Sequence, residues 1–165
     1  MTEGLLHTYM NDHLAAATAG EQLFHRAANN QSSRHYGPEL HALAASITED
    51  RARLRTLMTR LAVSENKPKQ LLARAAEYAG RVKPNRFVLR RSPLSDLLEI
   101  EAMRTGVTAK QAGWRALLAS EAADDPLVKD ELTDLQHRAE EQAQQLDRLH
   151  EHVANRVLGG GGAHE

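Results

Sequence analysis

The chain has 165 residues, a formal net charge of −1 at pH 7 and no cysteine. This length suits one domain with a sizeable core, and the lack of cysteine excludes disulfides, thiolate metal sites and cysteine nucleophiles. Aromatic residues are scarce, with one Trp, three Tyr and two Phe, so aliphatic side chains must fill the core. No apolar run reaches the length of a membrane span, and the opening residues lack the pattern of a signal peptide. We therefore expect a cytoplasmic protein that does not enter a membrane.

Basic residues are concentrated in one part of the chain. Residues 51–91 contain twelve Lys or Arg but only Glu65 and Glu77 as acids, a local balance of +10 that leaves −11 for the remainder. Such a segment is typical of a surface that binds nucleic acid or an acidic partner. The alternative is that it packs beside the acidic last helix of its own chain. The lack of interleaved aromatic residues favours this second interpretation.

Apolar residues recur every three or four positions along four long stretches, which is the period of an amphipathic helix. Pro38, Pro93 and Pro126 mark three helix starts, because proline is tolerated in the first helical turn. Ser92 and Asp125 precede two of these prolines as N-caps. The predicted helices are residues 2–28, 38–62, 93–120 and 126–158.

The connections between these helices differ in length. Short loops join the first pair and the last pair, so each pair should form an antiparallel hairpin. About thirty residues separate the two pairs, and a short helix is predicted there over residues 68–79, ended by Gly80 and Pro84. The expected fold is all-α: an antiparallel four-helix bundle in a single domain, residues 1–158, with a flexible Gly-rich tail over 159–165.

In helix lengths and connection lengths, residues 2–158 resemble the ferritin-like superfamily, whose bundles have one long crossover. Members that bind two metal ions use Glu-x-x-His motifs, which place a carboxylate and an imidazole on one helix face. The second predicted helix offers EDRA at residues 49–52, with alanine where the motif has histidine. The last helix offers only DRLH at residues 147–150, near its end. The resemblance therefore implies a divergent member that lacks an intact di-iron motif.

The helical period places a charged residue, Asp50 or Arg51, on the side of the second helix that is expected to be buried. When the helices are aligned at their connecting loops, Glu21 and Glu101 fall near one level and Asp50 lies close to it along the axis. His13 lies about two turns from Glu21. The candidate metal ligands are Glu21, Glu49, Asp50, Glu101 and His13.

Three interpretations of these carboxylates remain open. Arg51, Arg104 and Lys110 can neutralise them in a buried ion-pair network that holds no metal. Alternatively, the carboxylates bind one metal ion, and their oxygen ligands suit iron or manganese. In the third interpretation, the charged ends extend to solvent. We expect ion pairing, with Asp50-Arg51 as a replacement of a ligand position.

One face of the third predicted helix carries small residues at heptad spacing: Ala102, Gly106, Ala109, Gly113 and Ala116. Two glycines inside a helix should cost about 1 kcal/mol each relative to alanine. A close helical neighbour would offset this cost. We expect that neighbour to be the crossover segment or a second subunit.

The other histidines give weaker indications. His150 and His152 are two positions apart and point to different sides of a helix, so they cannot share one ion. This spacing does not favour the three-histidine metal site of a damage-inducible-type bundle, a remote family alternative.

Our leading hypothesis is therefore a non-catalytic scaffold or interaction protein with a degenerate metal site, whose partner is a second copy or another protein. The first alternative is a carboxylate-bridged iron or manganese protein or oxidase. The second is a module that binds nucleic acid or an acidic partner through residues 51–91.

Overall fold

A computed structural model describes residues 2–30, 36–67, 70, 73–77 and 92–159 of the chain. These residues form helices and no strand. None of their helices is apolar over a length sufficient to cross a membrane. The elements are α1 (Thr2–Asn29), α2 (Gly37–Arg60), α4 (Pro93–Leu118), the 3-10 helix η2 (Glu121–Asp124) and α5 (Pro126–Leu158). The prediction of an all-helical fold is confirmed, and the four long helices agree with their predicted bounds to within two residues.

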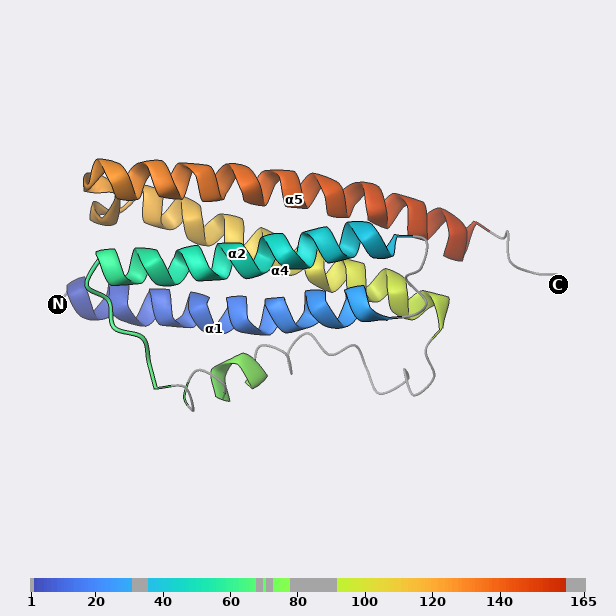
Figure 1. The fold of residues 1–165 in the computed structure, drawn as a ribbon, viewed down its shortest axis with the longest axis horizontal. Coiled ribbons are helices and arrows are strands. Elements are labelled where there is room, and N and C mark those ends of the chain that lie inside the picture. The colour runs from blue at the N-terminus through green and yellow to red at the C-terminus, as the bar shows by residue number, and fades with distance from the viewer. Residues whose placement is uncertain (1, 31–35, 68–69, 71–72, 78–91, 160–165) are drawn as a thin grey trace.

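The long helices form two hairpins that pack against each other (Figure 1). α1 and α2 run in opposite directions, as do α4 and α5. Contacts join α1 to α2 and α4 to α5 within the hairpins, and α1 to α4 and α2 to α5 between them. Each helix therefore lies beside two others.

Local sequence explains where α4 and α5 begin. The Ser95 hydroxyl at the third position of α4 accepts a hydrogen bond from the Ser92 backbone N–H at 3.2 Å. At the start of α5, Asp125 Oδ1 accepts one from the Leu127 backbone N–H at 2.9 Å. These bonds satisfy amide groups that have no partner within the helix.

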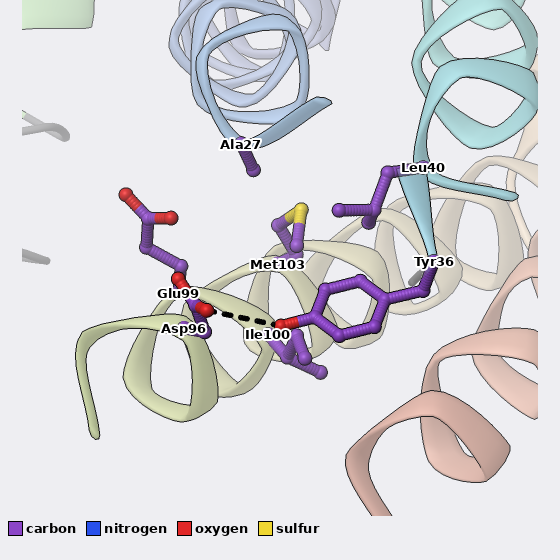
Figure 2. A pocket seen from close by; sticks show the side chains of 7 residues that line it. All are labelled: Ala27, Tyr36, Leu40, Asp96, Glu99, Ile100 and Met103. Atoms are coloured by element: carbon purple, nitrogen blue, oxygen red, sulfur yellow. Dashed lines mark hydrogen bonds between the residues drawn. The ribbon is translucent and has the colours of Figure 1, made fainter. Parts of the chain in front are cut away.

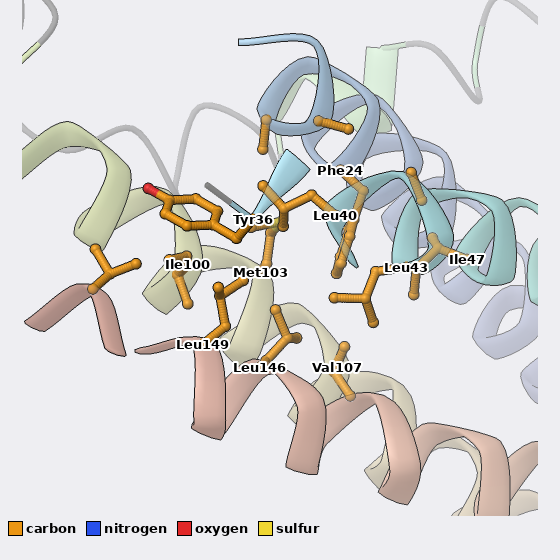
Figure 3. Close-up of a cluster of buried hydrophobic side chains, with 14 of the residues drawn as sticks. Phe24, Tyr36, Leu40, Leu43, Ile47, Ile100, Met103, Val107, Leu146 and Leu149 are labelled. Atoms are coloured by element: carbon orange, nitrogen blue, oxygen red, sulfur yellow. The ribbon is translucent and has the colours of Figure 1, made fainter. Parts of the chain in front are cut away.

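Two apolar clusters fill the interior. One lies around the loop that joins α1 to α2 and includes Phe24, Leu43 and Ile100 (Figure 3). The other lies toward the opposite end and includes Met10 and Leu132, both with no exposed surface. Side chains of all four long helices contribute to each cluster, so that removal of one helix would expose both.

The segment after α2 is attached to α1. Asn11 of α1 is fully buried, and its side chain accepts from the Asn66 N–H at 2.7 Å and donates to the Ser64 carbonyl at 3.0 Å. Farther along, Arg74 forms an ion pair with Asp12. Within the predicted short helix, residues 73–77 are helical. The predicted ending at Gly80 and Pro84 lies outside the described residues, as does all but the first residue of the predicted tail.

α2 ends in a left-handed turn at an alanine. Ala62 has a φ of 54°. Its N–H donates to the Thr59 carbonyl at 3.1 Å, and the Val63 N–H donates to the Met58 carbonyl at 2.8 Å, the paired bonds of a Schellman motif. Glycine usually occupies this position, because the left-handed conformation costs other residues about 1–2 kcal/mol.

We expect Ala62→Gly to raise the free energy of unfolding by about 0.5–1 kcal/mol, because the relief of strain exceeds the added entropy of the unfolded chain. Urea denaturation followed by circular dichroism measures this change. Ala52→Gly is the matched control, since Ala52 is exposed within α2 and the same change there should cost about 1 kcal/mol. Destabilisation of similar size at both positions would contradict the assignment of strain to Ala62.

Candidate functional site

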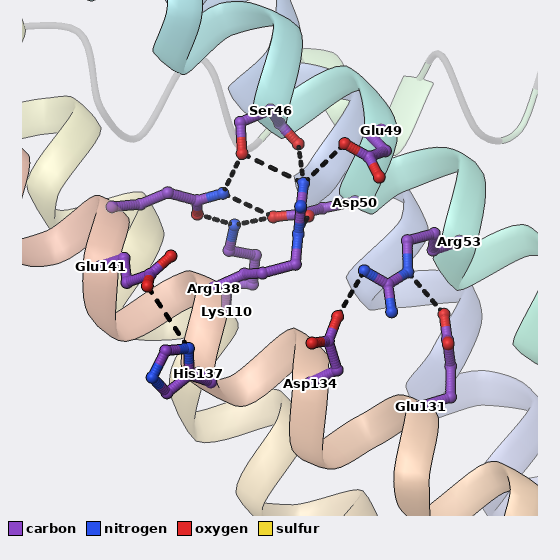
Figure 4. Close-up of polar contacts among 11 residues, drawn as sticks. Ser46, Glu49, Asp50, Arg53, Lys110, Glu131, Asp134, His137, Arg138 and Glu141 are labelled. Atoms are coloured by element: carbon purple, nitrogen blue, oxygen red, sulfur yellow. Dashed lines mark hydrogen bonds and ion pairs between the residues drawn. The ribbon is translucent and has the colours of Figure 1, made fainter.

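The carboxylate of Asp50, on α2, is buried, with 2% of its side chain exposed. Lys110 of α4 donates from Nζ to Asp50 Oδ2 at 2.6 Å. Arg138 of α5 donates from Nε to Asp50 Oδ1 at 2.7 Å. Two cations from two other helices therefore hold the two oxygens of one carboxylate (Figure 4).

Gln142, one turn beyond Arg138 on α5, completes the hydrogen bonding at Asp50. Its Nε2 donates to Asp50 Oδ2 at 2.8 Å and to the Ser46 hydroxyl at 2.8 Å. Its Oε1 accepts a bond from Lys110 Nζ. A side-chain amide is suited to this position, because it can donate to the carboxylate and accept from the ammonium group together.

Arg138 extends the contacts along α2. Its Nη2 donates to the Ser46 hydroxyl at 3.1 Å and to Glu49 Oε2 at 2.9 Å. Two carboxylates thus face two cations, and the cluster as a whole is neutral. We call this cluster the Asp50 network; its members are Ser46, Glu49, Asp50, Lys110, Arg138 and Gln142.

The charge of Asp50 is stabilised where it lies. Burial alone would raise its pKa. Attraction to Lys110 and hydrogen bonds from Lys110, Gln142 and Arg138 outweigh burial and lower the pKa of Asp50 below its ordinary value. The carboxylate therefore stays ionised at neutral pH.

The Asp50 network forms a polar layer between the two apolar clusters. On α2, Ile47 belongs to one cluster and Leu54 to the other. On α4, Val107 and Trp114 bracket Lys110 in the same way. The layer therefore interrupts the core at mid-length, where a helix that slipped by one turn would lose its charged partners.

A second ion-pair group lies beside this layer. Arg53 of α2 donates from Nε to Glu131 of α5 at 2.6 Å, and its Nη1 lies 2.7 Å from Asp134 Oδ2. The hydrogen bond from Arg53 to Glu131 raises the pKa of the guanidinium further above its ordinary value. Together with the Asp50 network, Arg53 joins α2 to α5 by charge.

The structure does not bring the predicted metal ligands together. Glu21 forms an ion pair with Arg51. Glu101 is exposed, and its Oε1 lies 3.1 Å from Nε2 of His150. Among the described residues, no group of three or more His, Asp or Glu side chains is arranged to hold a metal ion. Glu21 pairs with Arg51 and Glu101 lies beside His150, whereas Glu49 and Asp50 share Arg138.

Of the three predicted ion-pair partners, Lys110 contacts Asp50 and Arg51 contacts Glu21. Arg104 lies elsewhere: its Nε donates to Asp147 Oδ1 at 2.7 Å, between α4 and α5. Height along the axis brings Glu101 near the level of Glu21, but it does not determine which way the side chain points. The rotation of α4 turns Glu101 outward, whereas Asp96 and Lys110 of the same helix point inward.

His13 packs against Gly113 of α4. A methyl group added at Gly113 would lie 2.7 Å from Cε1 and 2.9 Å from Nδ1 of the His13 ring. The Tyr9 ring also contacts His13, with ring centroids 4.5 Å apart. Burial lowers the pKa of His13, although Asp12 opposes this shift. The glycine is therefore explained by a neighbour on α1, where we expected the crossover or a second subunit.

The rest of the small-residue face of α4 is more open. Gly106, Ala109 and Ala116 are exposed, and Ala102 is half-buried. A methyl group added at Gly106 would meet no atom of the described residues within 4 Å. The contact between α1 and α4 therefore accounts for one of the two glycines.

A shallow cavity lies near the start of α4 (Figure 2). Its volume is about 10 Å³, and its lining residues include Tyr36, Asp96 and Met103. The Tyr36 hydroxyl donates to Asp96 Oδ2 at 3.1 Å. Burial and the adjacent Asp96 carboxylate raise the pKa of Tyr36 to about 12. The cavity is smaller than small-molecule sites, which span about 300–1,000 Å³.

Several basic residues of the 51–91 segment are paired with acids of the same chain. Arg53 contacts acids of α5, Arg55 contacts Glu65 at 2.7 Å, and Arg74 contacts Asp12. In the described part of this segment, several positive charges are therefore neutralised by acids of the same chain. Of these three residues, Arg53 agrees with the expected packing beside the acidic last helix, whereas Arg55 pairs within the segment and Arg74 pairs with α1.

Sequence reasoning missed Arg138 and Gln142. One signal was available for Gln142, since it lies between Ala139 and Leu146 in the apolar stripe of α5, where all three are buried. A polar residue in such a stripe indicates a buried hydrogen-bonding partner. Arg138 lies at the edge of the stripe and gives no comparable signal.

No family model, curated protein or solved structure matches this chain.

We expect Asp50→Ala to lower the free energy of unfolding by about 3–5 kcal/mol, because it leaves Lys110 and Arg138 without their shared counter-charge. Glu101→Ala removes an exposed ion pair and should cost less than about 1 kcal/mol. Chemical denaturation of both variants measures the difference. Losses of equal size would show that the Asp50 network contributes no more than a surface pair.

Proposed function

We propose that this chain is a ferritin-like antiparallel four-helix bundle, without a metal centre, that acts as a non-catalytic scaffold or interaction protein. The observation that carries the proposal is the occupation of both Asp50 oxygens by Lys110 and Arg138. In a metal-binding bundle, the interior carboxylates bind metal ions. Here, the side chains of Lys110 and Arg138 supply the positive charge that a metal ion would supply there.

The chemistry of the Asp50 network supports this proposal. A divalent ion at Asp50 would have to displace an ammonium and a guanidinium group, and those two charges would then repel it. Gln142 supplies hydrogen bonds where a ligand set would need a further anion or an imidazole. The alternative of an iron or manganese protein would require Glu21 and Glu101 to leave their present partners and move toward Asp50.

Metal loading tests the proposal. The purified protein is incubated with Fe(II) without oxygen, or with Mn(II), then desalted and assayed by elemental analysis, beside Glu21→Ala and Asp50→Ala. We expect no metal above the buffer background in any of the three proteins. One metal ion per chain in the wild type, lost in both variants, would overturn the proposal in favour of the metal-binding alternative.

The exposed part of the small-residue face of α4 supports a protein partner for this scaffold. Gly106 is exposed and has room around it, yet a glycine within a helix costs about 1 kcal/mol relative to alanine. Close approach of another helix would explain its retention. In this proposal the partner is a second copy of the chain.

We expect Gly106→Leu to weaken self-association, because the side chain would separate the facing helices. Sedimentation equilibrium over a range of concentrations measures the association. Gly20→Leu is the matched control, since a methyl group added at Gly20 of α1 also meets no atom within 4 Å. If both variants associate as the wild type does, the α4 face is not the interface.

A further inference from the structure

The two hairpins are held together differently on their two sides. Between α2 and α5, the contacts include the buried charges of the Asp50 network and the Arg53 ion pairs. Between α1 and α4, an ion pair joins Arg26 and Glu99, with 3.8 Å between Nε and Oε1, and the partly buried His13 ring lies against the Gly113 backbone. At the α1–α4 contact, a titratable ring therefore packs directly on a helix backbone.

The surroundings of His13 suit a neutral ring. No hydrogen bond from a described residue reaches either ring nitrogen, and the partly buried ring contacts Tyr9 and Gly113. An imidazolium has two N–H donors, and no described residue accepts from either of them here. Burial of an unpaired charge is costly, so protonation should favour movement of the ring toward water.

The charged groups near this contact pair with residues other than His13. On α1, Asp12 is adjacent in sequence and is paired with Arg74 of the crossover. On α4, Lys110 lies one turn before Gly113, but its Nζ is held by Asp50 and Gln142. Two turns along α1, Glu21 is paired with Arg51 of α2. Asp12 gives partial compensation, which is insufficient to offset burial of the ring.

We propose that the packing of His13 on Gly113 is a pH-sensitive contact, and that protonation of His13 separates α1 from α4 while the Asp50 network keeps α2 on α5. This regulation does not depend on the proposed scaffold function. Its consequence is exposure of the apolar cluster beneath α1, which includes Met10 and Leu14, at mildly acidic pH.

Thermodynamic linkage determines in which direction pH changes the stability of the closed form. The pKa of His13 is lowered in the closed form, and it returns toward about 6.5 once the ring reaches water. The open form therefore binds more protons, and the closed form loses stability as pH falls below about 6.5 toward the lowered pKa. Each unit of pKa difference changes the opening equilibrium by about tenfold.

Hydrogen exchange between pH 7.5 and 5, expressed as protection factors, tests the proposal. We expect protection in residues 9–17 of α1 and 110–117 of α4 to fall on acidification, while residues 46–54 and 138–142 keep theirs. His13→Phe keeps an aromatic ring against Tyr9 and should abolish the fall. His25→Phe, at an exposed position on α1, should leave it unchanged.

Three outcomes would overturn the proposal: equal loss of protection in all four segments, no loss in the wild type, or the same loss in His13→Phe. Nuclear magnetic resonance titration of the wild-type His13 ring provides a measurement that does not depend on any variant folding. A pKa at or above that of free histidine would also overturn the proposal.

Discussion

Burial of the Asp50 carboxylate is the constraint on which the arrangement of the helices depends. An ionised group in the interior must be paired and fully hydrogen-bonded, or its desolvation outweighs the gain from packing. Lys110 and Arg138 must therefore reach one point from α4 and α5. Since one helical turn is about 5.4 Å, a slip of either helix by one turn would break these contacts. Apolar clusters tolerate such changes more readily, and we infer that the Asp50 network fixes the alignment.

This constraint acts on three of the four long helices. α1 contributes no side chain to the Asp50 network. It is held by apolar contacts, by the His13–Gly113 packing, by the Glu21–Arg51 and Arg26–Glu99 ion pairs, and by its hydrogen bonds to the segment after α2. The molecule thus has a charge-paired core of α2, α4 and α5 with α1 packed against it. Such a scaffold combines three helices whose alignment is fixed by buried charges with a fourth helix, α1, that contributes no charge to this network.

The helix bounds could be predicted from the sequence because the signals that set them are local. Apolar period, Pro38, Pro93 and Pro126, and the N-caps all act within a few residues of the boundary that they set. The charge of Asp50 in an apolar stripe also indicated correctly that the middle of α2 is unusual. The identity of its partners depended on helix rotation, which axial heights do not give. Axial height alone therefore puts Glu101 level with the other carboxylates, although its side chain is exposed, and gives no indication of Arg138.

The most direct test of the central claim is a double-mutant cycle between Asp50→Asn and Lys110→Met, measured by urea denaturation. If the buried charges are mutually dependent, each single change leaves a charge unpaired and the double change restores neutrality. The account predicts a coupling free energy of about 2–3 kcal/mol. Additive effects, with coupling below about 0.5 kcal/mol, would contradict the claim that this pair fixes the alignment of the helices.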